Sequence, residues 1–276
     1  MEDKMVGWSK PLTVTYITNI DNGTWTAVYN YARNGDMNYR TIQSSTTSFS
    51  YAGNKMAGAS GGESFSLDYD LNGVSHLDDG NMKTLPTTDT NSLVYNWDGK
   101  LRSAQKGSST ISLRYDPWGN RIKKTSSVNG ERKYIVDVVG DLPTILMEIN
   151  TGDSAVKKIY IYANSRIVMQ HDVVDNNKKY FYLHDRLGSV REIIDSSAAV
   201  KAHYNYNPFG KTLEISGLFG TTGNRFRFAG RWYDNEIDEY YLRARQYHPH
   251  IGRFTARDPV EGCFKEPMSW HKYLYC

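Results

Sequence analysis

The sequence contains little of what marks a membrane protein, a disulfide scaffold or a nucleic-acid-binding protein. Its two cysteines, Cys263 and Cys276, are too few for a disulfide scaffold or a four-cysteine zinc site. No run approaches the ~18 apolar residues of a membrane-spanning helix, so we expect no integral membrane segment. The net charge is only +3, from 33 basic and 30 acidic residues, which gives no general electrostatic basis for binding nucleic acid. The first residues also lack the apolar core of a signal peptide.

Helical periodicity is scarce as well. Two short stretches, 196–203 and 237–245, are helix candidates, and the second is equally compatible with a strand. Many other runs alternate polar with apolar or aromatic residues, as 109–115 and 178–183 do. Successive side chains of a strand point to opposite faces, so this alternation predicts strands with one buried and one solvated face. The sequence therefore predicts an all-β fold.

A short turn motif repeats along the chain. It consists of an aromatic residue or His, then Asp or Asn, two variable positions and Gly, and it occurs at 69–73, 95–99, 115–119, 184–188 and 206–210. Tyr would end a strand, Asp or Asn would cap the turn, and Gly would supply the left-handed conformation. The motif predicts a meander of β-hairpins built from stacked repeats, although unrelated hairpins with common turn residues explain it too. The residues expected to carry it include Tyr115, Asp116, Gly119, Asp185, Gly188, Tyr206 and Gly210.

The last third of the chain carries an ordered series of further motifs. They include Tyr-Tyr-Leu-Arg-Ala-Arg at 240–245, Gly-Arg-Phe at 252–254 and Asp-Pro at 258–259. Together with the turns, this series resembles the YD-repeat or RHS (rearrangement hotspot) family, and residues 180–262 resemble its RHS repeat-associated core. The structural motif residues that the resemblance assigns to the core are Tyr241, Arg243, Arg245, Gly252, Arg253, Phe254 and Pro259.

The resemblance implies a container. In this family, YD repeats form a spiral β-sheet shell around a C-terminal toxin domain, and the core module plugs or lines the end of the shell. By this resemblance, residues 1–175 are YD-type hairpin repeats, 176–262 are the core module, and 263–276 are a stub before a missing variable C-terminal region. We therefore expect a structural shell fragment of a toxin-delivery protein.

The resemblance also implies partners and a location. The partners are the toxin domain of the parent chain and its immunity protein, with no cofactor, metal or nucleic acid. The parent is expected to be secreted or located at the cell surface, in some relatives on the cell wall. An isolated chain is expected to self-associate, because it would expose strand edges that the complete spiral covers.

Asp258 is the candidate catalytic residue, since the resemblance implies an intramolecular aspartyl protease built from two Asp-Pro segments. Such chemistry needs two carboxylates that share a proton, and the sequence given stops before a second Asp-Pro segment appears. Asp234 and Asp238 are alternatives for the missing group. In the structural alternative, Asp258 caps the turn before Pro259. The chain as it stands is therefore not expected to be an enzyme.

The sequence departs from the usual core pattern at two further places. Residues 237–239 read Ile-Asp-Glu in place of Thr-Gly-Leu, which removes a tight glycine turn. Residues 247–249 read Tyr-His-Pro in place of Tyr-Asp-Pro. Both departures leave the local conformation open.

Other residue groups have less specific interpretations. We expect the seven arginines of 225–257 to face water or to pair with nearby acids rather than to bind phosphate or RNA. The glycine-rich residues 58–62 are interpreted as a flexible loop. The histidines near the two cysteines do not have the spacing of a zinc finger. The acids expected to pair are Asp234, Glu236, Asp238 and Glu239, and the histidines are His248, His250 and His271.

An adhesion or carbohydrate-binding module at a cell surface is the main alternative function. Aromatic rings on a β surface stack well on sugars. The candidate rings are Trp25, Trp97, Trp118 and Trp232.

Overall fold

The computed structural model describes residues 12–20, 23–32, 34–70, 80–140, 142–217, 219, 223–263 and 267–275. These residues form three antiparallel sheets, in which each strand pairs with the next one along the chain. The first sheet contains β1 (Leu12–Ile20), β2 (Gly23–Tyr31), β3 (Met37–Ile42), β4 (Ser45–Ala52), β5 (Lys55–Gly61) and β6 (Phe65–Ser66).

The second sheet has twelve strands and the third has four. The second contains β7 (Asn91–Tyr95), β8 (Leu101–Lys106), β9 (Ser109–Tyr115), β10 (Arg121–Ser126), β11 (Gly130–Asp137), β12 (Thr144–Ile149), β13 (Val156–Ala163), β14 (Arg166–Asp172), β15 (Lys178–His184), β16 (Val190–Asp195), β17 (Val200–Tyr206) and β18 (Thr212–Ser216). The third contains β19 (Trp232–Asp234), β20 (Glu239–Tyr241), β21 (Gln246–His248) and β22 (Arg253–Phe254). The predicted all-β fold is confirmed.

Within the described ranges, short 3-10 turns occur at η2 (Phe228–Gly230) and η3 (Pro267–Trp270), and Phe219 and Gly223 are in π-helical conformation. None of the helices in this part of the chain could cross a membrane. The helix predicted at 196–203 is wrong, and of the two alternatives for 237–245 the strand is confirmed at Glu239–Tyr241. Residues 196–203 form a turn and the start of β17, and 237–245 contain β20, because left-handed residues at Ala198 (φ 61°), Asp238 (φ 57°) and Arg243 (φ 64°) interrupt any helical run.

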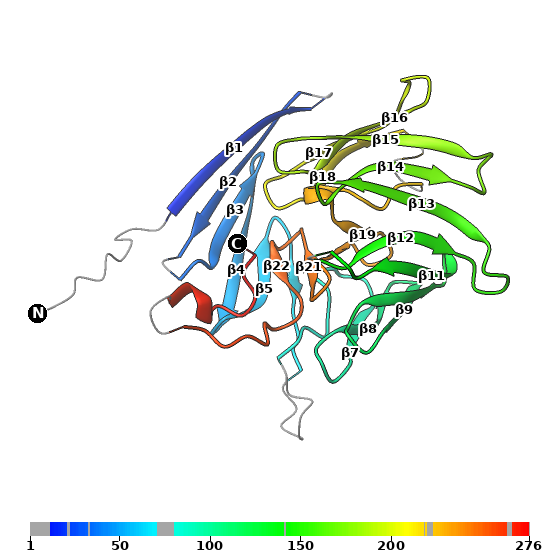
Figure 1. Cartoon of the computed structure of the whole chain (residues 1–276). Coiled ribbons are helices and arrows are strands. Elements are labelled where there is room, and N and C mark those ends of the chain that lie inside the picture. The colour runs from blue at the N-terminus through cyan, green and yellow to red at the C-terminus, as the bar shows by residue number, and fades with distance from the viewer. Residues whose placement is uncertain are drawn as a thin grey trace, which may run out of the picture.

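The third sheet lies at the centre of the molecule. Figure 1 shows it between the first sheet, in blue, and the second sheet, in green and yellow. Trp232 of β19 packs edge-to-face on Tyr134 of β11, with ring centroids 5.4 Å apart. Tyr240 of β20 donates a hydrogen bond to the carbonyl of Gly210, between β17 and β18. Strands from both halves of the second sheet therefore contact the small sheet.

The turn motif adopts one geometry wherever the structure describes it in full. In the copy at 115–119, the Asp116 N–H bonds the Asn120 carbonyl, and the Gly119 N–H bonds the Asp116 carbonyl. The Asp116 carboxylate accepts from the N–H groups of Trp118 (3.0 Å) and Asn120 (2.8 Å). The copies at 95–99, 184–188 and 206–210 repeat the backbone bonds, and their glycines have φ between 73° and 85°. This confirms the predicted turn chemistry, while the copy at 69–73 lies partly outside the described residues.

A second contact recurs beside these turns. The hydroxyl of Tyr115 donates to the carbonyl of Leu101, on the preceding strand, at 2.8 Å. Tyr51, Tyr162 and Tyr206 make the equivalent bond to the preceding strand, at 2.7–2.9 Å. Burying a phenol requires a partner for its hydroxyl. These four tyrosines thus tie neighbouring strands together.

One position of the fold bears on the predicted organisation. The expected boundary at 175/176 lies between β14 and β15, which pair within one continuous sheet, so the division into modules stays a prediction.

The glycine-rich residues 58–62 are not a flexible loop, because 58–61 belong to β5. A Cβ on Gly58 would lie 2.5 Å from the Phe65 carbonyl oxygen, so glycine permits the close approach of β6.

The turn glycines supply a test of the motif. Gly99 (φ 73°) has open space around an added Cβ, whereas a Cβ on Gly210 (φ 85°) would lie 2.5 Å from the Phe228 ring. We expect Gly99→Ala to cost about 1–2 kcal/mol of unfolding free energy from the left-handed conformation alone. Gly210→Ala should cost about 1–3 kcal/mol more, because it also overpacks the core. Urea unfolding followed by tryptophan fluorescence measures both, and equal losses would contradict this interpretation.

Candidate functional site

The junction between the small third sheet and the two larger sheets is the candidate functional site. Its first element is the turn between β19 and β20. Although the glycine of the usual pattern is missing there, Asp238 takes up the left-handed conformation, with φ 57°. Asp tolerates this conformation better than most residues. The turn is therefore kept, and its side chains acquire new contacts.

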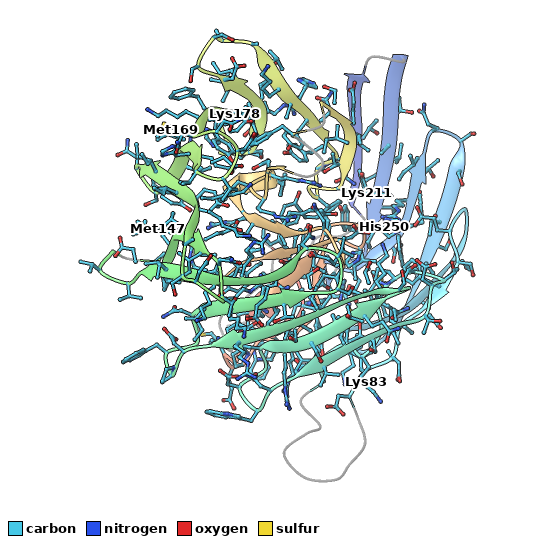
Figure 2. All side chains as sticks on the ribbon, turned by 90° about the vertical axis from the view of Figure 1, so that its right-hand side faces the viewer. Lys83, Met147, Met169, Lys178, Lys211 and His250 are labelled. Atoms are coloured by element: carbon cyan, nitrogen blue, oxygen red, sulfur yellow. The ribbon has the colours of Figure 1, made fainter. Side chains whose placement is uncertain are left out.

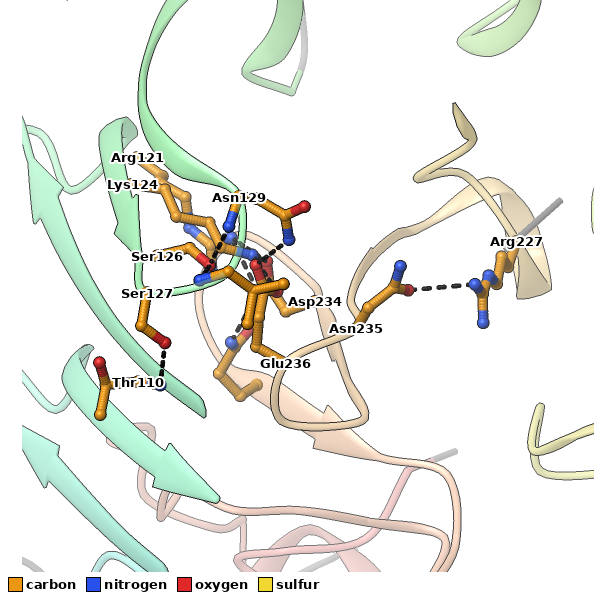
Figure 3. A network of polar contacts seen from close by, with 12 residues as sticks. Thr110, Arg121, Lys124, Ser126, Ser127, Asn129, Arg227, Asp234, Asn235 and Glu236 are labelled. Carbon is orange, nitrogen blue, oxygen red and sulfur yellow. Dashed lines mark hydrogen bonds and ion pairs between the residues drawn. The ribbon is translucent and has the colours of Figure 1, made fainter. Parts of the chain in front are cut away.

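Asp234, at the end of β19, is the centre of a buried ion cluster (Figure 3). The Arg121 guanidinium donates to both carboxylate oxygens, at 3.1 and 2.8 Å. Lys124 binds Asp234 and Glu236, each at 2.7 Å. Burial alone would raise the pKa of Asp234, but Arg121 and Lys124 hold it well below its usual value. Two cations of β10 and two anions of the β19–β20 hairpin thus neutralise each other in a largely buried position.

Polar and aromatic neighbours complete this cluster. Gln246 of β21 donates to Asp234 at 3.1 Å, and Asn129 donates to Glu236 at 2.7 Å. The Arg121 guanidinium lies 3.8 Å from the centre of the Tyr241 ring. The Nε and Nη2 atoms of Arg121 and the Oε1 atom of Gln246 have no hydrogen-bond partner among the described residues. The bonds that are made still join β19, β20 and β21 to β10, because separating them would leave the buried charges unpaired.

Two further ion clusters fix the small sheet to the first sheet. Arg253 of β22 binds the Asp36 carboxylate and donates to the Asn54 carbonyl at 2.9 Å. His271 also binds Asp36, at 2.9 Å, so this cluster includes the C-terminal segment. In the other cluster, Glu63 lies 2.5 Å from both Arg40 and His250. Arg253, assigned to the core from the sequence, is thus the central cation of the Asp36 cluster.

The predicted pairing of the arginines in 225–257 with acids of their own segment is wrong for the described ion pairs. Asp234 and Glu236 bind Arg121 and Lys124, and Asp238 binds Lys106. Arg253 and Arg245 instead bind Asp36 and Asp258. The hairpin directs these acids toward β8 and β10, which are more than a hundred residues earlier in the chain.

Asp258 lies at the edge of a separate cavity of about 460 Å³, which Trp97, Arg257 and Glu261 also line. One of its carboxylate oxygens is 2.9 Å from Arg245, and the other accepts the Val260 N–H at 3.0 Å. The second bond is the turn cap that the structural alternative expected. Among the described contacts, none joins Asp258 to another carboxylate, and Asp234 and Asp238 are engaged elsewhere. The catalytic assignment of Asp258 stays a prediction.

The remaining core motif residues have structural contacts. Arg245 lies 3.7 Å from the Phe254 ring centre, and Arg243 donates to the Pro143 carbonyl at 2.6 Å. Gly252 has φ 66° and lies close to Phe209, where an added Cβ would be 2.8 Å from the ring. Pro259 lines the same cavity as Asp258.

The described tryptophans proposed to stack on sugars do not gather on one surface. Trp97 and Trp118 are 85% and 84% exposed at two turns, whereas Trp232 is 5% exposed in the core. The side chain of Trp25 lies outside the described residues, as does Cys276. Over the part of the chain that the structure describes, no group of three His, Cys, Asp or Glu side chains could hold a metal ion.

The sequence predicted that Glu239 pairs with a nearby arginine, and its burial at the junction was missed. Glu239 is fully buried, and neither of its carboxyl oxygens makes a hydrogen bond of good geometry with the described residues. Burial raises its pKa to about 8, aided by the nearby Asp234 and Asp238, while Thr255 and Arg121 offset only part of the rise. The sequence did indicate that this acid would be buried, because Glu239 stands where the usual pattern has leucine.

Comparisons with known proteins agree with this architecture. The family model described as Teneurin YD-shell matches residues 13–275. The chain is 34% identical over 216 residues to the tRNA3(Ser)-specific nuclease WapA of Bacillus spizizenii, covering 76% of this chain and 8% of that protein. It is 29% identical over 176 residues to the double-stranded DNA deaminase toxin A of Burkholderia cenocepacia, covering 53% of this chain and 12% of that protein.

A solved structure shares the fold. The crystal structure of TcdB2-TccC3 superposes with a TM-score of 0.65 at 20% identity, and the match covers 96% of this chain and 14% of that one. The resemblance to YD-repeat shells that the turn and core motifs indicated is thereby confirmed. The chain spans less than a tenth of the length of the WapA relative.

The Asp234 cluster predicts a large loss of stability on neutralisation. Asp234→Asn leaves Arg121 and Lys124 without their shared anion, so we expect a loss of about 3–5 kcal/mol in unfolding free energy. The matched control is Asp175→Asn, which removes an exposed partner of Lys178 and should change little. Chemical denaturation of the whole chain compares them, and a similar small effect in both variants would refute the anchoring role.

Glu239 predicts a stability that falls with rising pH. The native state holds this proton up to about pH 8, whereas the unfolded chain releases it near pH 4.5. The contribution of this bound proton to the free energy of unfolding is therefore complete below pH 4.5 and is lost as pH rises toward 8. Glu239→Leu should gain stability over the wild type as pH rises from 5 to 8, with Glu261→Gln as an exposed control. Thermal melts at both pH values measure this, and parallel pH profiles for wild type and Glu239→Leu would contradict it.

Proposed function

Because the chain belongs to the Teneurin YD-shell family, we propose that it forms an end section of a shell that encloses the toxin domain of its own parent protein. The observation that carries the proposal is the central position of the small sheet. Buried ion pairs fix that sheet to the second sheet through Asp234 and to the first sheet through Asp36. Such a sheet would plug the end of the curved wall.

The names of the relatives support a toxin as the enclosed domain. They describe a tRNA nuclease and a DNA deaminase toxin, and this chain corresponds to 8–12% of those proteins. In the proposal, catalysis belongs to a toxin domain of the parent, and this chain provides only the enclosure. An immunity protein for that toxin and a secreted or cell-surface parent are parts of the same proposal.

The strand edges supply the proposed contacts with the rest of a shell. β1 and β6 are the edge strands of the first sheet, and β7 and β18 are those of the second. An unpaired edge offers N–H and C=O groups to another strand. The parent chain would pair with some of these edges, and a separate 276-residue chain would self-associate through them. Asp258 is kept as one member of a proteolytic pair that the parent would complete.

Enclosure predicts that the toxin domain resists proteolysis while the end is closed. In the wild-type parent, limited trypsin digestion should leave the toxin domain intact under conditions that degrade the free domain. Asp234→Asn should loosen the small sheet and speed this cleavage at least several-fold, because it leaves two buried cations unpaired. The rate is read from the toxin-domain band over time.

The matched variant for this experiment is Asp175→Asn, which alters an exposed ion pair on the second sheet. It should protect the toxin domain as well as the wild type does. Cleavage of the wild-type toxin domain at the rate of the free domain would refute enclosure. Equal protection in Asp234→Asn and wild type would refute the role of the small sheet as the plug.

A further inference from the structure

A cavity of about 350 Å³ lies where the small sheet meets both ends of the second sheet. Lys106 comes from β8 and Lys211 immediately precedes β18, so strands near opposite ends of the twelve-stranded sheet contribute to one cavity. Asp238 of the β19–β20 turn and His248 of β21 complete it from the small sheet. Figure 2 shows Lys211 close to His250, beside the first sheet.

The lining carries an excess of positive charge. Lys106 is neutralised by Asp238, which also accepts a hydrogen bond from the Tyr233 hydroxyl at 3.1 Å. The Lys211 ammonium makes no hydrogen bond or ion pair within the described part of the chain. Burial lowers its pKa, Arg40 adds to this effect, and Glu63 and Asp238 counteract it only from a distance. A partly buried ammonium without a hydrogen-bonding partner would be stabilised by an anion placed in the cavity.

His248 provides a second and independent feature. Its side chain is 5% exposed, and its Nδ1 atom has no partner among the described residues. Burial lowers the pKa of His248 well below its usual value, and His250, Lys106 and Lys211 lower it further. Both effects favour the neutral ring. An anion in the cavity that this side chain lines would favour the charged imidazole instead.

We propose that this cavity binds a small oxyanion, with Lys211 as its charged ligand and the His248 ring beside it in the cavity wall. A cation is disfavoured, because two ammonium groups face the space. Two sources share the required chemistry: a free tetrahedral anion of the phosphate class, or the planar carboxylate of an acidic side chain on another polypeptide segment. The proposal concerns the cavity of this chain alone and does not depend on enclosure of a toxin.

The test uses the 276-residue chain and two probes, inorganic phosphate and acetate, each against chloride at equal ionic strength. Binding should raise the melting temperature by roughly 2–5 °C at ten times the dissociation constant. It should also raise the pKa of His248, followed by NMR of its ring nitrogens, because an anion favours the charged imidazole. Stronger stabilisation by phosphate assigns the tetrahedral class, and stronger stabilisation by acetate assigns a carboxylate.

Lys211→Met removes the charged ligand while keeping the aliphatic stem, and it should abolish both responses. The matched control is Lys83→Met, which removes a lysine whose only described ion pair, to Asp68, is at 3.8 Å and which lies apart from Lys211 in Figure 2. Lys83→Met should respond as the wild type does. The proposal is overturned if neither probe shifts the His248 resonances. It is also overturned if Lys211→Met keeps the full response.

Discussion

The contact on which the architecture depends is the buried pairing of Asp234 with Arg121 and Lys124. Burying charges costs so much solvation free energy that such a pair adds little net stability compared with apolar packing. It nevertheless couples β10 to the small sheet, because moving one away from the other would leave the buried charges unpaired. The Asp36–Arg253 pair imposes the same condition on the first sheet. Aromatic contacts such as Tyr134–Trp232 supply buried area, while the ion clusters determine where the small sheet lies.

This constraint is needed because a meander of hairpins does not determine its own curvature. Each strand of the second sheet pairs with its sequence neighbours, and hydroxyls such as those of Tyr115 and Tyr206 tie a strand to the one before it. These contacts specify local register but leave the two ends of a long sheet free to approach or to separate. The small sheet removes that freedom, since Tyr241 contacts Arg121 near one end and Tyr240 contacts Gly210 near the other.

The difference between contacts of neighbouring strands and contacts of distant segments explains how much could be predicted from the sequence. The turns were predictable because Asp116 caps residues no more than four positions away, and strand alternation follows from neighbours two positions apart. Arg121 and Asp234 are 113 residues apart, and nothing near either residue indicates the other. For this reason, acids of the 234–239 hairpin were matched with the wrong arginines. The helix predicted at 196–203 is wrong because the left-handed residue Ala198 interrupts it.

The departures from the usual core pattern gather at one place in the fold. The changes at 237–239 and 247–249 are about ten residues apart in sequence. They bring Asp238 and His248 to the lining of one cavity, with Glu239 buried on β20 next to Asp238 in the chain. Asp238 forms an ion pair with Lys106 while its left-handed conformation preserves the turn. A frame shared with other YD shells therefore carries local chemistry of its own at the junction of its sheets.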